Sequence, residues 1–428
     1  MDKLQFAVPT LFGLEGLAAD EMRRLELKEV QAENGRVLCQ GTAADIPRLN
    51  LNLRTGERVL IVLGSFPANN FDQLFEGTKA LPWEQFIPRD GQFPVKGFSL
   101  NSQLHSVPTC QAMIKKAVAA RLGGKYGLNQ MPETGALYQI QFSIMKDTAT
   151  LMLDTSGAGL HKRGYRAKGV VAPLRETLAA AMVMLSRYKG RDPLCDPFCG
   201  SGTIPIEAAL IAKNRAPGLS RNFSAQKWKN VDGKLWLQAA DEAMDKEFDG
   251  EYEIWGGDLD PQAVEMARRN AELAEVDDVV KFEVSDATRF HWGGLHGRVV
   301  TNPPYGERLM TEAEAADLYR AMGRRFATFE PWQIYVLTSS DRFDRLYGQR
   351  ADKVKKLYNG MLPCYLYEYF KPAEARDEKG RTAKEIFDRK PDRGFERGSD
   401  RYPADRNRKP SFGDRDRKPY GPRADRPY

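Results

Sequence analysis

The stretch that decides the fold is LCDPFCGSGTIPIEAAL, residues 194–210. An apolar strand ends in Asp196, a loop with Gly200 and Gly202 follows, and a helix is expected to begin near Thr203. Because glycine has no Cβ atom, this loop lets a ligand approach the backbone at the carboxyl end of the strand. The stretch predicts the ligand-binding strand, loop and first helix of an α/β domain.

The residues around this loop argue against a phosphate ligand. The Gly-Lys-Ser/Thr run of a P-loop and the GxGxxG spacing of a dinucleotide site are both missing. Asp196 would repel a pyrophosphate, whereas a carboxylate accepts hydrogen bonds from the ammonium group of an amino acid. S-adenosylmethionine, which joins an amino acid to an adenosine, is the ligand that fits.

The next two expected strands also end in acidic residues. Asp258, in GGDLDP, is expected to accept hydrogen bonds from both ribose hydroxyls, and Asp286, in VSDAT, from the adenine amino group. Asp260 is expected to cap the following helix. A single Asp at such a position is more often only a cap or a strand terminator. Acidic residues at three successive strand ends favour a cofactor site.

The fourth expected strand ends in Asn302-Pro303-Pro304-Tyr305. The prolines fix the backbone and have no N–H donor, which leaves the Asn302 side-chain oxygen and the Pro303 carbonyl as acceptors for an exocyclic amino group. Tyr305 offers a ring for a base to stack on. Because an amine conjugated to a base is a poor nucleophile, holding it in line and accepting its developing charge would supply most of the catalysis. We expect an amino methyltransferase that uses neither a metal nor a covalent nucleophile.

From about residue 174 to residue 372, strands alternate with helices, which predicts a mostly parallel sheet covered on both faces. Seven strands are expected, the last two as an antiparallel pair: DPLCDPF (192–198), YEIWGGD (252–258), VVKFEVSD (279–286), GRVVTNPP (297–304), WQIYVLTS (332–339), DKVKKLYNG (352–360) and CYLYEYF (364–370). The segment 214–250 is longer than an ordinary connection and is treated as an insertion of undisclosed purpose.

The first third of the chain predicts two smaller α+β units. Residues 3–64 read as strand-helix-strand-strand-helix-strand, the order of a ferredoxin-like fold. The second unit is expected to contain helices near 71–81 and 108–122 and strands near 93–99, 136–145 and 148–154. Lys115 and Lys116 fall at the centre of the second helix. They are candidates for RNA contact, although a solvated helix face explains them equally well.

Charge and composition set the remaining expectations. The net charge of +6 comes largely from residues 373–428, which hold 17 Lys or Arg against 12 Asp or Glu. This tail is nearly devoid of aliphatic residues, so we expect it to be disordered, either as an RNA-binding or as a solubilising segment. The five cysteines have no paired spacing, which favours reduced core thiols and predicts no metal site. Without an apolar stretch long enough to cross a bilayer, the chain is expected to be cytosolic.

The chain resembles the THUMP-domain class I methyltransferases, specifically bacterial ribosomal RNA guanine-N2 methyltransferases related to the N-terminal half of the RlmL type, a family often labelled N6-adenine-specific DNA methylases. The matching stretches are FPVKGFSLNSQLHSVPTCQAMIKKAV (93–118), LDTSGAGLHKRGYR (153–166), APLRETLAAAMVMLSR (172–187), DPFCGSGTIPIEAALIAKNRAPG (196–218) and TNPPYGERL (301–309).

This resemblance implies a domain order and assigns residues. It implies a ferredoxin-like domain (1–65), a THUMP domain that binds structured RNA (66–156) and a seven-stranded Rossmann-like methyltransferase domain (157–372), followed by the tail (373–428). A helix that begins near Pro173 would close over the cofactor. The residues it assigns to S-adenosylmethionine are Asp196, Gly200, Gly202, Thr203, Asp258 and Asp286, and those it assigns to the target base are Asn302, Pro303, Pro304 and Tyr305.

HKRGYR, residues 161–166, gathers basic side chains where the RNA-binding part should meet the catalytic part. We interpret Lys162, Arg163 and Arg166 as a phosphate clamp, with an exposed linker as the alternative. For the whole chain, an RNA guanine-N2 methyltransferase, most simply of 23S ribosomal RNA, is the preferred interpretation. The alternatives are an adenine-N6 methyltransferase and an RNA-binding assembly factor with a vestigial enzyme domain. DNA readout is disfavoured because we recognise no helix-turn-helix.

Overall fold

The computed structural model describes residues 3–166, 174–293, 296–304, 311–329 and 332–370. All of them belong to one compact unit, Met1–Phe387, while a second unit, Asp388–Tyr428, lies outside the described residues. The predicted disorder of residues 373–428, the helix start at Pro173 and the stacking ring of Tyr305 also fall outside them.

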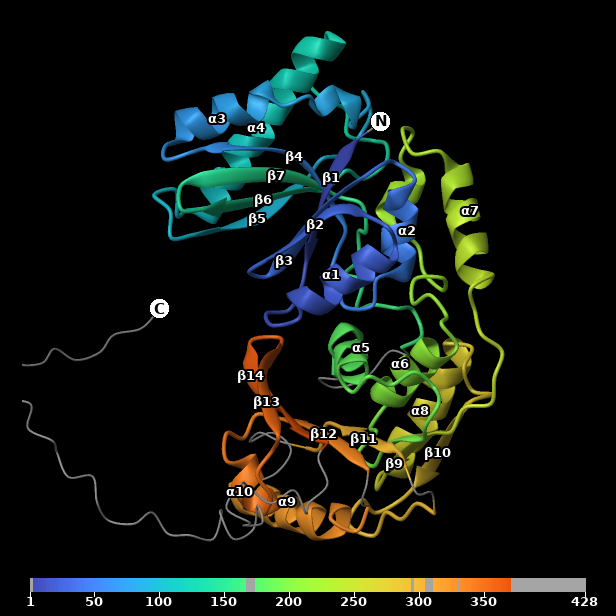
Figure 1. Cartoon of the computed structure of the whole chain (residues 1–428). Helices are drawn as coiled ribbons and strands as arrows, with labels where there is room; N and C mark the ends of the chain where they lie inside the picture. Colours follow the sequence, from blue (N-terminus) through green and yellow to red (C-terminus); the bar gives the residue numbers. More distant parts are fainter. Residues whose placement is uncertain (1–2, 167–173, 294–295, 305–310, 330–331, 371–428) are drawn as a thin grey trace, which may run out of the picture. The chain divides into compact units, whose positions relative to one another are not determined.

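The first sheet has seven strands in the order β2-β3-β1-β4-β7-β6-β5 (Figure 1). Its strands are β1 (Leu4–Pro9), β2 (Lys28–Glu33), β3 (Arg36–Gly41), β4 (Leu60–Pro67), β5 (Val95–Leu100), β6 (Ile140–Met145) and β7 (Thr148–Asp154). With α1 (Glu15–Arg24) and α2 (Asp45–Asn52), the first four strands form the ferredoxin-like order that the sequence predicts. That prediction is confirmed.

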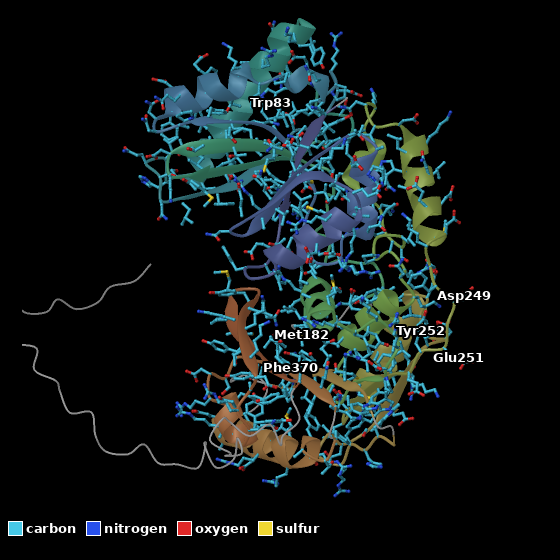
Figure 2. All side chains as sticks on the ribbon, in the orientation of Figure 1. Trp83, Met182, Asp249, Glu251, Tyr252 and Phe370 are labelled. Atoms are coloured by element: carbon cyan, nitrogen blue, oxygen red, sulfur yellow. The ribbon has the colours of Figure 1, made fainter. Side chains whose placement is uncertain are left out.

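The two N-terminal units share this sheet, because β4 belongs to both. Residues 60–62 of β4 pair with β1, and the whole strand, 60–67, pairs antiparallel with β7. The expected boundary at 65/66 therefore falls inside a strand. The helices of the second unit are α3 (Phe71–Ala80), the 3-10 turn η1 (Trp83–Gln85) and α4 (Val107–Tyr126). Trp83, labelled in Figure 2, is fully buried among them and donates its indole N–H to the Thr78 carbonyl.

The second sheet is the doubly wound sheet that the sequence predicts, in the order β10-β9-β8-β11-β12-β14-β13. The strands are β8 (Leu194–Asp196), β9 (Ile254–Asp258), β10 (Val280–Val284), β11 (Arg298–Thr301), β12 (Gln333–Thr338), β13 (Lys353–Asn359) and β14 (Leu362–Tyr369). The first five are parallel, and β14 runs antiparallel to both β12 and β13. The predicted antiparallel pair is confirmed.

Two apolar cores cover the two faces of this sheet. One contains buried residues of α5 (Glu176–Leu185), α6 (Thr203–Ala212) and α8 (Pro261–Leu273), including the labelled Met182 (Figure 2). The other contains those of α9 (Glu312–Phe326) and α10 (Phe343–Tyr347). Asp260 accepts a hydrogen bond from the Gln262 amide, so the predicted cap of α8 is confirmed. All five cysteines are free and buried, as expected for reduced core thiols.

The insertion 214–250 packs on the N-terminal sheet domain instead of the methyltransferase core. It contains the 3-10 turn η2 (Ser224–Lys227) and α7 (Gly233–Met244), and α7 contacts α2. Trp228 stacks on Tyr138 with ring centroids 4.8 Å apart and donates to the Leu137 carbonyl at 2.8 Å. Trp236 joins the same N-terminal core. The insertion therefore holds the two domains together, which its sequence did not disclose.

Candidate active site

The polar residues of the predicted site lie at the carboxyl edge of the second sheet. Strands β10, β9, β8 and β11 are parallel neighbours, and register pairs Asp196 with Gly256 and Asp258 with Val284. Asp286 follows β10 by two residues, and Asn302 follows β11 directly. The structure thus brings the residues of four strand ends to one edge, where α/β sheets bind ligands.

The two loop glycines differ in what they do. At Gly202, φ is +82°, and an added Cβ would lie 2.9 Å from both the Ala267 Cβ and the Phe282 ring. The positive φ and the close packing against α8 and β10 both require glycine there, and the expected contact of Gly202 with the cofactor stays a prediction. At Gly200, an added Cβ would meet no described atom within 4 Å. Gly200 is the loop position with open space for a ligand.

Asp196 is a buried carboxyl group, 1% exposed. Its Oδ1 accepts hydrogen bonds from the Thr301 hydroxyl at 2.6 Å and from the Phe198 amide at 3.1 Å. Burial raises the pKa of Asp196 to about 7, and the nearby charge of Asp258 also raises it. A cationic group placed beside Asp196 would stabilise its ionised form.

Asp258 and Asp286 are partly exposed and fixed by local hydrogen bonds. Asp258 accepts from the Gly200 amide at 2.9 Å and from the Asp260 amide at 3.0 Å, so it also holds the loop. Asp286 accepts from the hydroxyl and the amide of Thr288, which lower the pKa of Asp286. Both carboxylates remain at the edge, and their ribose and adenine contacts stay predictions.

Asn302 is the clearest candidate for holding the target base. Its Oδ1 is buried and has no hydrogen-bond partner among the described residues. Pro303 is buried and Pro304 half-buried, and neither has an N–H to offer. An unpaired buried acceptor costs about 1–3 kcal/mol, so at this ligand-binding edge Asn302 Oδ1 is available to a donor from a bound molecule. An amino group is such a donor.

The predicted phosphate clamp is wrong for Arg163. Its side chain is 3% exposed and pairs with Glu207 of α6 through Nε at 3.3 Å, while its other nitrogens reach the Leu160 and Arg54 carbonyls. Tyr165 donates its hydroxyl to the same Glu207 at 3.1 Å, and burial raises the pKa of Tyr165. We call Arg163, Tyr165 and Glu207 the junction cluster. Sequence reasoning missed Glu207, although one charge inside the apolar run TIPIEAALIA was its signal.

The remaining basic candidates divide into engaged and exposed side chains. Arg166 binds Glu176 and Thr203, and Lys115 forms an ion pair with Glu133 and lies 3.8 Å from the centre of the Phe93 ring. Lys115 is engaged within the fold, and Arg166 is held inside it by its Nε and Nη2, so neither extends into solvent as an exposed phosphate clamp would. Lys162 and Lys116 are exposed.

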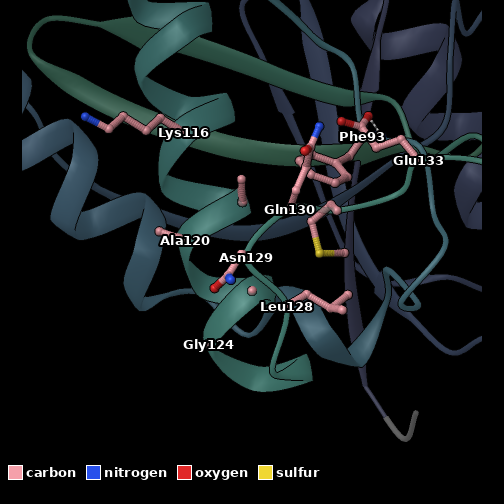
Figure 3. A pocket seen from close by; sticks show the side chains of 11 residues that line it. Phe93, Lys116, Ala120, Gly124, Leu128, Asn129, Gln130 and Glu133 are labelled. Carbon is pink, nitrogen blue, oxygen red and sulfur yellow. Dashed lines mark hydrogen bonds between the residues drawn. The ribbon is translucent and has the colours of Figure 1, made fainter.

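Lys116 borders a shallow hollow of about 490 Å³ near the end of α4, at some distance along the chain from the strand ends (Figure 3). Phe93 and Glu133 line another part of it, together with Asn129 and Gln130. Two cationic candidates, Lys116 and Lys162, therefore remain available to RNA, on different domains.

The described residues fit S-adenosylmethionine. Gly200 leaves open space at the loop, Asp196 is a buried acceptor beside it, and Asp258 lies at the neighbouring strand end. Among the described ranges, three or more His, Cys, Asp or Glu side chains nowhere gather as a metal-binding group. In that same part of the chain, every helix is too short or too polar to span a membrane.

Comparison with known proteins shows which families this chain resembles. Three family models match: an RlmL ferredoxin-like domain at residues 5–60, a THUMP domain at 68–154 and an RMKL-like methyltransferase domain at 163–368. The chain is 41% identical to the "Putative RNA methyltransferase YpsC" of Bacillus subtilis (strain 168), covering 90% of this chain and all of that protein. It is 36% identical to the ribosomal RNA large subunit methyltransferase K/L of Syntrophotalea carbinolica, over 83% of this chain and 52% of that enzyme. The chain thus spans about half the length of the K/L enzyme.

Two solved structures have the same fold over most of the chain. One is described as a "predicted N6-adenine-specific DNA methylase" from Listeria monocytogenes, with 45% identity, a TM-score of 0.83 and coverage of 87% of this chain and 97% of that one. The other is the protein SMU.472 complexed with SAH, with 39% identity, a TM-score of 0.82 and coverage of 86% and 98%.

Sheet order, loop and strand-end acids together define a class I methyltransferase, the class whose methyl donor is S-adenosylmethionine. Within that class, the chain belongs to the RMKL-like methyltransferases that carry an RlmL-type ferredoxin-like domain and a THUMP domain.

Proposed function

We propose that this protein transfers a methyl group from S-adenosylmethionine to the exocyclic N2 amino group of a guanine in structured RNA, namely 23S ribosomal RNA. The observation that carries the proposal is the buried Oδ1 of Asn302 at the end of β11, an acceptor suited to an amino group and without a hydrogen-bond partner in the part of the chain that the structure describes. The RNA assignment is supported by the THUMP domain and by relatives named as RNA and ribosomal RNA methyltransferases.

The side chains at the sheet edge have separate tasks in this reaction. Asn302 Oδ1 and the Pro303 carbonyl accept the N–H groups of the base, which orients the nitrogen lone pair and stabilises the positive charge that grows on nitrogen as it is methylated. Asp196, fixed by Thr301, accepts hydrogen bonds from the ammonium end of the methyl donor. The donor supplies the methyl group from its sulfonium. The extra proton leaves the methylated nitrogen to water.

An adenine-N6 methyltransferase is the second candidate, because one solved relative is described as an N6-adenine-specific DNA methylase and Asn-Pro-Pro-Tyr would grip an adenine amino group by the same chemistry. The two candidates differ in the base and in the polymer that accept the methyl group.

The deciding experiment incubates the protein with S-adenosylmethionine labelled in its methyl group and total RNA from cells that lack the gene. A parallel reaction receives genomic DNA, and a third receives the Asn302→Ala protein. After digestion to nucleosides, we expect label in N2-methylguanosine from RNA alone. Label in N6-methyladenosine, or from DNA only, contradicts the proposal and leaves the methyltransferase class intact.

A further inference from the structure

Arg166 reaches the cofactor loop from the linker that precedes the catalytic domain. Its Nη2 donates to the Thr203 hydroxyl at 3.2 Å, and Thr203 is the first residue of α6, directly after Gly202. Nη2 also donates to the Leu174 carbonyl at 3.0 Å, and Nε donates to Glu176 at 3.0 Å. The guanidinium is therefore fixed between the start of α5 and the start of α6.

One nitrogen of this guanidinium is left over. Nη1 is buried and has no hydrogen-bond partner in the ranges that the structure describes. Arginine nitrogens are donors only, and Nη1 and Nη2 together form the end of the planar fork. Because Nη2 donates to Thr203, an acceptor bound by Nη1 would lie next to the first turn of α6. Leaving a charged donor buried without one is costly, so the position calls for an acceptor.

The acceptor that suits this place is an anion. The first turn of α6 favours negative charge because its amides point outward along the helix dipole. The methionine part of S-adenosylmethionine is a zwitterion, and its carboxylate is the only anionic group of that molecule. Asp196, on the strand before the same loop, is the matching acceptor for the ammonium group. The loop is thus flanked by one anionic and one cationic side chain, as a zwitterion requires.

We propose that Arg166 binds the α-carboxylate of S-adenosylmethionine through Nη1, and that it positions the methyl donor rather than RNA. The inference rests on the methyl donor and is independent of which base is methylated. It replaces the phosphate contact that the sequence suggested for Arg166.

The test compares two ligands that differ only in the carboxylate: S-adenosylmethionine and decarboxylated S-adenosylmethionine, both titrated calorimetrically. A hydrogen bond to a charged group predicts about tenfold or greater preference of the wild-type protein for the complete ligand. In Arg166→Met this preference is expected to fall to about twofold or less, while the affinity for the decarboxylated ligand stays near the wild-type value. Arg166→Lys, which keeps the charge, is expected to recover part of the preference.

Lys162→Met is the matched control, since Lys162 is an exposed cation in the same segment, and both affinities should be unchanged. If Arg166→Met lowered the affinity for both ligands equally, Arg166 would only support the loop, and the proposal would be overturned. Equal binding of both ligands by the wild-type protein would overturn it even if Arg166→Met failed to fold. Loss of all binding in the wild type would instead contradict the methyl-donor assignment.

Discussion

The junction cluster and the carboxyl edge of the second sheet both bury polar and ionisable groups. They differ in whether those groups find partners within the chain. At the junction, Arg163 and Tyr165 find Glu207 within the chain, and each remaining nitrogen of Arg163 reaches a carbonyl. At the edge, Asn302 Oδ1 and Arg166 Nη1 are buried and unmatched by any described residue. A buried polar group that the chain itself satisfies supports the fold, whereas one left without a partner at the edge where α/β sheets bind ligands is a candidate contact for a ligand.

The largest effect is expected at the junction. Arg163→Met leaves Glu207 buried without its cation, and breaking a buried pair typically lowers the free energy of unfolding by about 3–5 kcal/mol. Denaturant unfolding measures this loss. Arg320→Met is the control, because its pair with Asp317 is exposed and contributes about 1 kcal/mol or less. If both variants lost an equally small free energy of unfolding, the junction cluster would not be a support of the fold.

The next effect tests the edge. Asn302→Ala removes the acceptor for the target amino group and is expected to slow methyl transfer by about 10²- to 10³-fold, with unchanged affinity for S-adenosylhomocysteine and RNA. Single-turnover rates and binding titrations separate chemistry from affinity. A folded variant with near wild-type turnover would remove Asn302 from the catalytic residues.

A smaller effect is expected at Asp258, which holds the loop through Gly200 and is predicted to bind the ribose. Asp258→Ala should weaken S-adenosylhomocysteine binding by about 10- to 100-fold. Asp260→Ala, two residues away, removes only the cap of α8 and should cost about 1 kcal/mol of stability without changing that affinity. If Asp260→Ala weakened S-adenosylhomocysteine binding and Asp258→Ala did not, Asp258 would not be the residue that binds the ribose.

The most gradual effect, spread over several pH units, is a pH dependence from Asp196. Because burial raises the pKa of Asp196 from its usual value of about 3.8 to about 7, the folded protein holds a proton that the unfolded chain releases. The contribution of this proton to the free energy of unfolding is fully present below about pH 3.8 and is lost as the pH rises to about 7. The free energy of unfolding falls over this range by at most about 1.4 kcal/mol per pH unit. Unfolding of the ligand-free protein between pH 4 and 7 should show this trend, and Asp196→Asn should flatten it. If the stability of the wild-type protein changed with pH in the same way as that of Asp196→Asn, the raised pKa of Asp196 would be contradicted.

The sequence predicted those parts of the molecule that depend on local order. The strand ends with Asp196, Asp258 and Asn302 were placed correctly because parallel neighbours present their carboxyl ends at one edge whatever the details of packing. The antiparallel final pair and the ferredoxin-like order were equally readable from alternation and spacing.

Contacts between distant segments were not readable. Arg163 resembled a surface cation because its partner Glu207 lies 44 residues further on. The role of Gly202 could not be assigned either, since the neighbours that exclude a side chain, Ala267 and Phe282, belong to α8 and β10. Likewise, the strand β4 is divided by an expected boundary because its second partner, β7, begins more than 80 residues later.

The insertion 214–250 also determines when the N-terminal domain can finish folding during synthesis. Leu137 accepts a hydrogen bond from Trp228, which the ribosome adds 91 residues later, and Phe223, Trp228 and Trp236 all complete the N-terminal core. At about 5–20 residues per second, the N-terminal domain waits roughly 5–20 s for the segment that finishes it. During that interval the face of Tyr138 that Trp228 later covers is exposed, so the first domain to be made is completed only by a segment inserted in the second.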